Sequence, residues 1–167
     1  MSIDISFDQW LIVRGIFYQS INCHFIAYRN LLARGKMAIV QNGSPLFSGD
    51  AGSGPSEIRR YMLENDWLEA IIQLSTDQFM NTGISTYIWV FNKDKPSYRA
   101  GKVQLIDASH CYEARRKPIG TKRNDITDKC RELIVRAYGD FSNKIYGKKG
   151  GIYCESKIFD TTDFGYN

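Results

Sequence analysis

Short apolar runs and one helical spacing alternate through the middle of the chain. The runs lie at residues 36–41, 68–74 and 86–91, and their lengths are typical of buried strands. Between the first two, residues 55–66 place Ile58, Tyr61 and Met62 on one helical face, and Pro55 suits the first turn of a helix. Two strands connected through a helix predict a parallel pair and an α/β fold.

The third run differs from the first two in its composition and in its connection. Residues 86–91 are β-branched and aromatic without polar alternation, which predicts a strand buried on both faces. Only residues 75–85 separate it from the second strand. A parallel crossover needs about a dozen residues or more, usually helical, so we expect the third strand to run antiparallel to the second.

The flanking segments give weaker patterns. Residues 7–34 place apolar side chains at three- and four-residue steps, which predicts a long helix weakened at Gly15. Residues 102–107 alternate weakly and predict an added edge strand, and residues 126–139 predict one more helix. From Phe141 onward the chain is polar and rich in Gly and Tyr, and we expect a loop.

The net charge of +4 arises from one segment of the chain. Residues 113–149 hold eleven Lys and Arg against five Asp and Glu. We expect this basic cluster to form a loop, because Pro118 and Gly120 interrupt it. Such a loop can follow a phosphate backbone, although a solvated surface explains it equally well. The cluster consists of Arg115, Arg116, Lys117, Lys122 and Arg123.

The cysteines and histidines predict no metal centre. The four cysteines are far apart in sequence, so we expect reduced thiols and a cytoplasmic protein. His24 follows Cys23 and Cys111 follows His110, and adjacent side chains point to different faces of a helix or strand, which makes a shared metal awkward. No apolar run is long enough to span a membrane. We assign no catalytic residue, because no carboxylate pair or catalytic triad can be built.

Six short phrases together resemble the modification (methylation) subunit of type I restriction–modification systems, which are N6-adenine DNA methyltransferases. The resemblance runs from about residue 31 to the end of the chain. The phrases are residues 41–47 (QNGSPLF), 54–60 (GPSEIRR), 79–84 (FMNTGI), 106–109 (IDAS), 122–124 (KRN) and 157–166 (KIFDTTDFGY).

The resemblance implies a fold, a cofactor and partners. The fold is α/β, a partial class I methyltransferase-like (Rossmann-like) mixed sheet with an antiparallel last strand, flanked by helices. Residues 1–112 would be the C-terminal half of the catalytic domain, and residues 113–167 a basic helical and loop extension packed on it. The methyl donor of the full-length family is S-adenosylmethionine. The implied partners are DNA and the specificity and restriction subunits.

The resemblance also implies a pocket for the target base. It places Phe79, Thr82 and Ile84 there, and the aromatic ring could stack on an extruded adenine. The residue types alone favour a loop aromatic folded over the core; the match to the family favours the pocket. Gln41 and Asn42 end a strand at the carboxyl edge of the sheet, where they could cap a loop or line the donor or adenine site.

Two motifs of the family are absent from this sequence. These are the Gly-rich donor turn and the Asn-Pro-Pro-aromatic turn; Gly49, Gly52 and Gly54 lack the spacing of a dinucleotide fingerprint and are expected to form a surface loop. We therefore expect the chain alone to bind no S-adenosylmethionine and to be inactive. The alternative is a non-catalytic remnant that binds DNA or partner subunits. A homodimer through the long first helix, or through residues 36–41 as an exposed edge strand, is also plausible.

Overall fold

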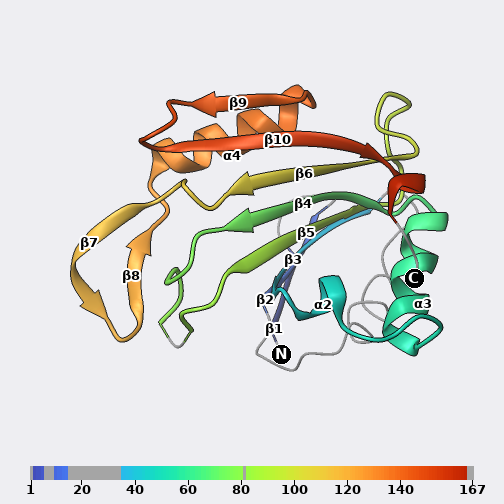
Figure 1. The fold of residues 1–167 in the computed structure, drawn as a ribbon, viewed down its shortest axis with the longest axis horizontal. Coiled ribbons are helices and arrows are strands. Elements are labelled where there is room, and N and C mark those ends of the chain that lie inside the picture. Colours follow the sequence, from blue (N-terminus) through green and yellow to red (C-terminus); the bar gives the residue numbers. More distant parts are fainter. Residues whose placement is uncertain (1, 6–9, 15–34, 81, 165–167) are drawn as a thin grey trace. The chain divides into compact units, whose positions relative to one another are not determined.

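The computed structural model describes residues 2–5, 10–14, 35–80 and 82–164 (Figure 1). Eight of the strands in these residues are hydrogen-bonded in the order β1-β2-β3-β5-β4-β6-β10-β9, and β7 pairs with β8 in a separate hairpin. The chain forms two compact units, which are described separately. One unit comprises the described residues of 1–70, 88–103 and 159–167, and the other comprises residues 71–87 and 104–158.

The first unit begins with three paired strands of the larger sheet. Strand β1 (Ser2–Ile5) pairs antiparallel with β2 (Trp10–Arg14), which pairs in parallel with β3 (Lys36–Asn42). The predicted helix over residues 7–34 is therefore wrong at 10–14, where the run WLIVR is an apolar strand sequence whose β-branched content outweighs the helical spacing. The rest of that prediction lies outside the described residues.

Strand β5 (Thr86–Asn92) lies between β3 and β4 (Leu68–Leu74). The Asn92 amide at the end of β5 donates to the Trp67 carbonyl just before β4, at 2.9 Å, and the Lys93 amide donates to the Gly35 carbonyl before β3, at 3.3 Å. Strand β5 therefore runs antiparallel to both neighbours, and its direction relative to β4 is the one that the short connection predicted. Its second half is buried on both faces, with Trp89 and Phe91 at most 2% exposed.

The position of β5 corrects one expectation. Strand β3 has β2 on one side and β5 on the other, so residues 36–41 are not an exposed edge. The backbone of β3 is therefore not free to pair with a strand of a second copy of the chain, as a homodimer through that edge would require. The other proposed contact, the long first helix, lies outside the described residues.

Helix α3 (Gly54–Glu64) follows β3 and begins after Ser53, with Pro55 in its first turn, as predicted. Arg59 of this helix is half-buried, and its guanidinium donates to the carbonyls of Pro45 and Ser48 at 3.1 and 2.6 Å. These hydrogen bonds connect α3 to the short helix α2 (Ser44–Phe47) and to Ser48, which follows it.

Buried charges hold the segment after β5 against the start of β4. Glu69 and Arg99 form an ion pair at 3.2 Å, with side chains 2% and 3% exposed. Lys95 pairs with Asp66, and burial lowers the pKa of Lys95 while the Asp66 carboxylate opposes that shift. Asp66 also accepts from the Gly101 amide at 2.8 Å. Residues 93–101 are thus an ordered connection.

In the second unit, helix α4 (Asp128–Asp140) confirms the predicted helix over residues 126–139. Strand β6 (Lys102–Ala108) carries Gln104, which is completely buried. The Gln104 amide donates to the Ala137 carbonyl of α4 and to the Ser156 hydroxyl of β10, both at 2.8 Å. One amide therefore ties a helix and a strand to β6, which lies between β4 and β10 and not at an edge as predicted.

The segment after Phe141, predicted as a loop, contains β9 (Lys144–Gly147) and β10 (Tyr153–Asp160), followed by a 3₁₀ turn, η1 (Thr161–Asp163). Strands β9 and β10 pair antiparallel, from Tyr153 opposite Gly147 to Ser156 opposite Lys144. Cys154 and Ser156 are buried on alternate positions of β10. Burial therefore alternates along β10, but the buried positions hold the small residues Cys154 and Ser156, so no alternation of large apolar residues marks the strand in the sequence.

The thiols of Cys111, Cys130 and Cys154 are free and buried in this unit. Cys111 donates to the Tyr153 carbonyl at 3.1 Å. The hydrogen bond with Cys154, and then burial, raises the pKa of Cys111, so this group stays a neutral thiol. In the described part of the chain, no helix is long and apolar enough to cross a membrane.

The buried ion pair predicts a large effect of a single substitution in the first unit. Arg99→Ala leaves the Glu69 carboxylate buried without this cation, and we expect unfolding to need about 3–5 kcal/mol less free energy. Arg60→Ala is the control, because Arg60 is 47% exposed in its pairs with Glu57 and Glu64 and should cost less than about 1 kcal/mol. Urea denaturation measures both. Equal small losses would contradict the buried pair.

Candidate nucleic-acid interface

In the loop between β4 and β5, residues 75–85, two polar side chains are buried and three apolar ones are exposed among the described residues. Ser75 and Gln78 are 4% and 6% exposed and hydrogen-bond to each other. Phe79, Met80 and Ile84 are 40%, 56% and 51% exposed. Isolated exposed apolar residues are common, but three of them in one short loop with buried polar neighbours indicate a contact surface.

The backbone of this loop is tightly folded. Phe79 and Thr82 form an isolated antiparallel bridge, and the Thr82 hydroxyl accepts from the Ile84 amide at 3.3 Å. Asp77 has a positive φ of 57°. Phe79 therefore lies on the loop with a partly exposed ring, where the sequence predicted it, although its role in binding a base is a separate matter.

The basic cluster is not a loop, as the sequence suggested, but a β-hairpin. Strand β7 (Glu113–Ile119) pairs antiparallel with β8 (Lys122–Asp125), and Ile119 stands opposite Lys122 across the turn Gly120-Thr121. Gly120 has φ +58°, and glycine at the first central position of a two-residue turn is typical of a type II′ hairpin. The short connection lets the cationic strands pair with each other.

The hairpin is hydrogen-bonded to the β4–β5 loop. The Thr121 amide donates to the Met80 carbonyl at 3.0 Å, and the amides of Arg123 and Asn124 donate to the Asp77 carbonyl at 3.0 and 3.2 Å. The Asn124 side chain donates to the Thr76 carbonyl at 2.9 Å. The structure thus brings together two sites that the sequence predicted separately.

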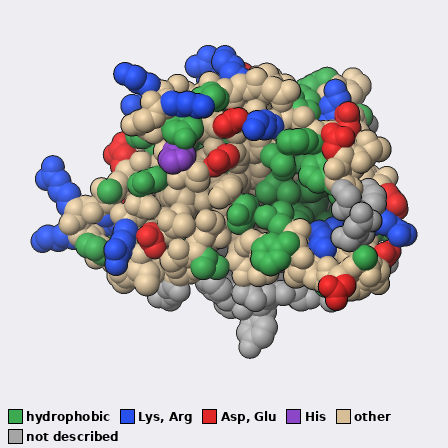
Figure 2. Space-filling model, viewed as in Figure 1, with side chains coloured by type: hydrophobic (Ala, Val, Ile, Leu, Met, Phe, Trp, Pro, Cys, Tyr) green, Lys and Arg blue, Asp and Glu red, His purple; other side chains and the backbone are tan. Residues whose placement is uncertain are grey.

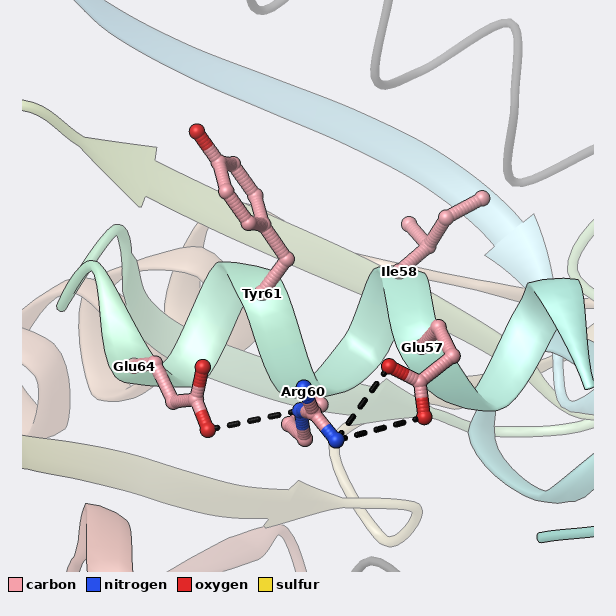
Figure 3. A pocket seen from close by; sticks show the side chains of 5 residues that line it. All are labelled: Glu57, Ile58, Arg60, Tyr61 and Glu64. Carbon is pink, nitrogen blue, oxygen red and sulfur yellow. Dashed lines mark hydrogen bonds and ion pairs between the residues drawn. The ribbon is translucent and has the colours of Figure 1, made fainter. Parts of the chain in front are cut away.

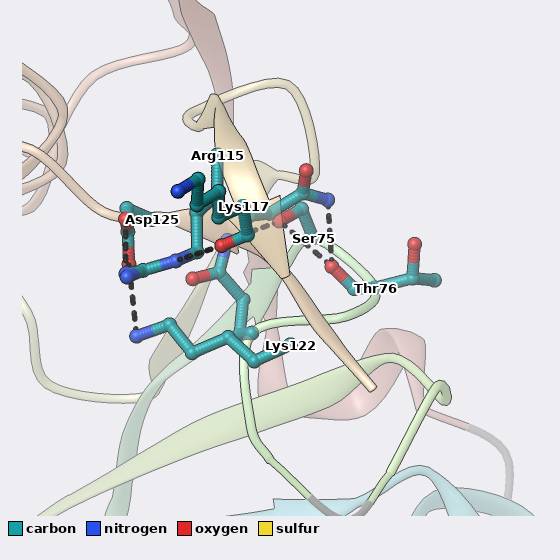
Figure 4. Close-up of polar contacts among 8 residues, drawn as sticks. Ser75, Thr76, Arg115, Lys117, Lys122 and Asp125 are labelled. Carbon is teal, nitrogen blue, oxygen red and sulfur yellow. Dashed lines mark hydrogen bonds and ion pairs between the residues drawn. The ribbon is translucent and has the colours of Figure 1, made fainter. Parts of the chain in front are cut away.

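The five cations of the hairpin divide into two groups. Arg115 and Lys122 both bind the Asp125 carboxylate, at 2.6 and 2.9 Å (Figure 4), and the hydrogen bonds from Lys122 and then Arg115 lower the pKa of Asp125. Their charge is partly neutralised. The other three are exposed and form no ion pair within the described residues: Arg116, Lys117 and Arg123.

Figure 2 shows Lys and Arg side chains projecting from the region of the hairpin. The exposed cations and the exposed apolar residues of the β4–β5 loop belong to the same compact unit. A surface that combines cations with an exposed aromatic ring suits a nucleic acid, because the cations contact phosphates and the ring stacks on a base.

Asn42, at the end of β3, has a structural role. The Asn42 carboxamide oxygen accepts from the Ser44 amide at 3.2 Å, which caps the turn into α2. This geometry matches the first of the two roles left open for Asn42. Gln41 is half-buried, and both residues belong to the other compact unit.

Helix α3 carries a shallow cavity of about 250 Å³ lined by Glu57, Ile58, Arg60, Tyr61 and Glu64 (Figure 3). Arg60 lies between the two carboxylates, at 3.3 Å from Glu57 and 3.4 Å from Glu64. Because one guanidinium binds both, neither carboxylate is placed for acid–base catalysis. Among the described residues, no group of three or more His, Cys, Asp or Glu could hold a metal.

In the Gly-rich loop before α3, a glycine is required at position 49 by contacts within the loop itself. A cofactor cradle brings a ligand against glycines where a side chain would collide with it. A Cβ at Gly49 would instead meet Ser53 and Pro55 of the same loop, whereas one at Gly52 or Gly54 would meet no described atom within 4 Å. We therefore assign no step of a methyl transfer to these residues.

The anchoring residues Thr121 and Asn124 were missed by sequence reasoning. A signal was present, because residues 113–119 and 122–125 flank a two-residue connection that contains glycine, and such spacing favours a hairpin. The charged residues and Pro118 made the strands look like a loop.

The turn predicts opposite effects for two identical substitutions. A Cβ at Gly120 would lie 2.8 Å from the Met80 carbonyl oxygen, and its φ of +58° is strained for alanine, so Gly120→Ala should destabilise the chain by about 1 kcal/mol or more. Gly139 lies in α4 with no described atom near its Cβ position, so Gly139→Ala should stabilise by about 0.5–1 kcal/mol. Thermal unfolding measures both, and a neutral Gly120→Ala would contradict the close approach.

Comparisons with a family model and with individual proteins point to the same group of relatives. Residues 19–160 match the model of the N-6 DNA Methylase family. Two type I restriction enzyme methylase subunits of Methanocaldococcus jannaschii are similar: MjaIX, 30% identical over 120 residues, and MjaVIII, 32% identical over 114. The matches cover 72% and 68% of this chain but 20% and 19% of the relatives. The chain thus spans about a fifth of the length of these curated relatives.

Solved structures agree with the fold. The type I restriction-modification methyltransferase subunit from Streptococcus thermophilus superposes with a TM-score of 0.68 at 25% identity, covering 86% of this chain and 27% of that one. The M protein of the type I restriction enzyme EcoKI gives a TM-score of 0.56 at 16% identity, covering 84% and 34%, and supports the fold alone. The mixed α/β fold is class I methyltransferase-like. The chain belongs to the N-6 DNA methylase family, with the methylase subunits of type I restriction–modification enzymes as its relatives.

Proposed function

We propose that this chain contributes the DNA-contacting, target-base side of an adenine-specific DNA methylase. The observation that carries the proposal is the exposed Phe79 on a loop hydrogen-bonded to a basic hairpin. Methylation of the adenine amine requires the base to leave the duplex stack. Phe79 offers an aromatic face to the extruded base, and Thr82 and Ile84 flank it on the same loop.

The hairpin contributes binding without reading sequence. In this proposal Arg116, Lys117 and Arg123 contact phosphates, and phosphate contacts hold a protein on DNA but carry no base information. In the complete enzyme, the specificity subunit selects the site, and a restriction subunit joins the assembly. An enzyme of this kind acts on cellular DNA, so we also propose a cytoplasmic location.

The chemistry requires residues beyond this surface. S-adenosylmethionine would supply the methyl group in the complete methylase, but this sequence contains neither the Gly-rich donor turn nor the Asn-Pro-Pro-aromatic turn. The chain alone is therefore proposed to bind DNA without catalysing methyl transfer. The same absence equally favours the alternative, a non-catalytic module that binds DNA or partner subunits. A saturable S-adenosylmethionine site in calorimetric titration of the chain would contradict both.

The exposed cations predict weak, sequence-independent DNA binding that falls steeply with salt. Three phosphate contacts would give a log–log slope of about −2.7, at about −0.9 for each contact. Replacing Arg116, Lys117 and Arg123 by Ala should bring the slope close to zero, because the partly neutralised Arg115 and Lys122 contribute little. Fluorescence anisotropy at several salt concentrations measures the slope.

A matched control removes the same charge from helix α4. Replacing Lys129, Arg131 and Arg136 by Ala also lowers the net charge by three, but we expect the slope to stay near its original value. Equal effects of the two triple variants would show that total charge, rather than the hairpin, controls binding.

The exposure of Phe79 predicts that its loss affects binding more than folding. Phe79→Ala should cost at most about 1 kcal/mol of stability, because 40% of the residue is exposed, and should weaken binding to a duplex with an unpaired adenine. The control Phe91→Ala removes a ring that is 1% exposed and should cost about 3–5 kcal/mol. Denaturation and anisotropy test the pair; a stability loss for Phe79→Ala as large as that of Phe91→Ala would make Phe79 a core residue.

A further inference from the structure

The β4–β5 loop does not hold its shape through burial of its own apolar side chains. Phe79, Met80 and Ile84 all face solvent, so they contribute little hydrophobic stabilisation to a single loop conformation. Among the described residues of the loop, its internal support includes the Ser75–Gln78 hydrogen bond, the bond from the Ser75 hydroxyl to the Thr76 carbonyl and the contacts of Thr82. A ring presented on such a loop needs a support from outside it.

Three backbone amides of the hairpin supply part of that support, and two of its side chains add to it. The Thr121 hydroxyl donates to the Met80 carbonyl at 2.6 Å and lies 3.2 Å from the Phe79 carbonyl. The Asn124 carboxamide donates to the Thr76 carbonyl at 2.9 Å. The bonds reach the loop backbone on both sides of Phe79, at Thr76 and at Met80, and therefore restrict where the ring can lie.

The chemistry of these contacts is specific. Each acceptor is a main-chain carbonyl of the loop. Each hydrogen bond therefore restricts the position of the loop backbone, independently of the side chains that the loop carries. Thr121 is exposed, so its hydroxyl contributes little to a core, and Gly120 beside it permits the close approach to Met80. The hydroxyl of Thr121 thus acts on the loop rather than on the packing of the hairpin.

We infer that Thr121 and Asn124 are positioning residues for the target base, because they hold the Phe79 loop in the conformation that accepts an unpaired adenine. This inference rests on the proposed function. Neither residue contacts the base or the phosphates. They act through the backbone of residues 76–80, so their loss should lower the preference for an unpaired adenine without changing phosphate contacts.

The test uses the full 167-residue chain and two DNA probes of one sequence, a paired duplex and the same duplex with a single unpaired adenine. The measured quantity is the ratio of the two dissociation constants. We expect a preference of about fivefold or more for the unpaired adenine in the unmodified chain, the lower end of what one stacked base contributes. Thr121→Val, which keeps the size but removes the hydroxyl, should reduce the ratio to within about twofold of the Phe79→Ala value.

Two further variants separate positioning from a structural role. Thr121→Ser keeps the hydroxyl and should retain the preference. Asn124→Ala removes the Thr76 contact without altering the turn and should lower the ratio, which gives an independent test should Thr121→Val fail to fold. For Thr121→Val and Asn124→Ala, the salt dependence of binding to the paired duplex should equal that of the unmodified chain.

The outcomes distinguish this inference from the function on which it rests. If Phe79→Ala abolishes the preference while Thr121→Val and Asn124→Ala retain it, the positioning role is wrong and the target-base function stands. If the unmodified chain shows no preference, or Phe79→Ala leaves it unchanged, both are wrong. A loss of the ratio accompanied by a changed salt slope would assign Thr121 to phosphate binding and also overturn the inference.

Discussion

The hydrogen bonds between the β7–β8 hairpin and the β4–β5 loop are the constraint on which the candidate site depends. Three amides of the hairpin, those of Thr121, Arg123 and Asn124, donate to the carbonyls of Asp77 and Met80. Without these bonds, the cations and the exposed ring would belong to two independent segments, which strands β5 and β6 separate in the sequence. With them, a positively charged surface and an aromatic face are parts of one connected surface, a combination that suits DNA with an extruded base.

The sheet provides the second constraint. Insertion of β5 between β3 and β4 makes the connection after β4 a short return loop, so that Phe79 must lie at a sheet end. The paired charges Glu69 and Arg99, with Lys95 and Asp66, hold the opposite connection of β5. The loop that carries the proposed pocket therefore does not have to cover the core, and its apolar side chains can face solvent.

The sequence predicted the elements whose pattern is hydrophobic and missed those whose pattern is polar. Strands β3, β4 and β5 and helices α3 and α4 follow apolar runs and helical spacing, and the direction of β5 follows from the length of its connection. Strand β10 was missed because Cys154 and Ser156 fill its buried positions, and the hairpin was missed because its strands are held by pairing and ion pairs rather than by burial. Strand β2 was assigned to a helix because its apolar residues also satisfy helical spacing.

The site was predicted in parts. Phe79, Thr82 and Ile84 came from a resemblance, and the cations came from charge counting, but neither pattern places one beside the other. Their association depends on long-range hydrogen bonds between backbone groups, which carry no residue-type signal. For the same reason Arg115 and Lys122 could not be distinguished from the three exposed cations, since only the fold brings Asp125 between them.

The central claim is that the loop and the hairpin form one DNA-binding surface. Amide chemical-shift mapping by NMR, during titration with a duplex that carries one unpaired adenine, tests it most directly. The account predicts concerted shifts, with a single dissociation constant, for the amides of residues 77–84 and 115–124, and none for α3. Shifts confined to the hairpin, or centred on α3, would contradict it.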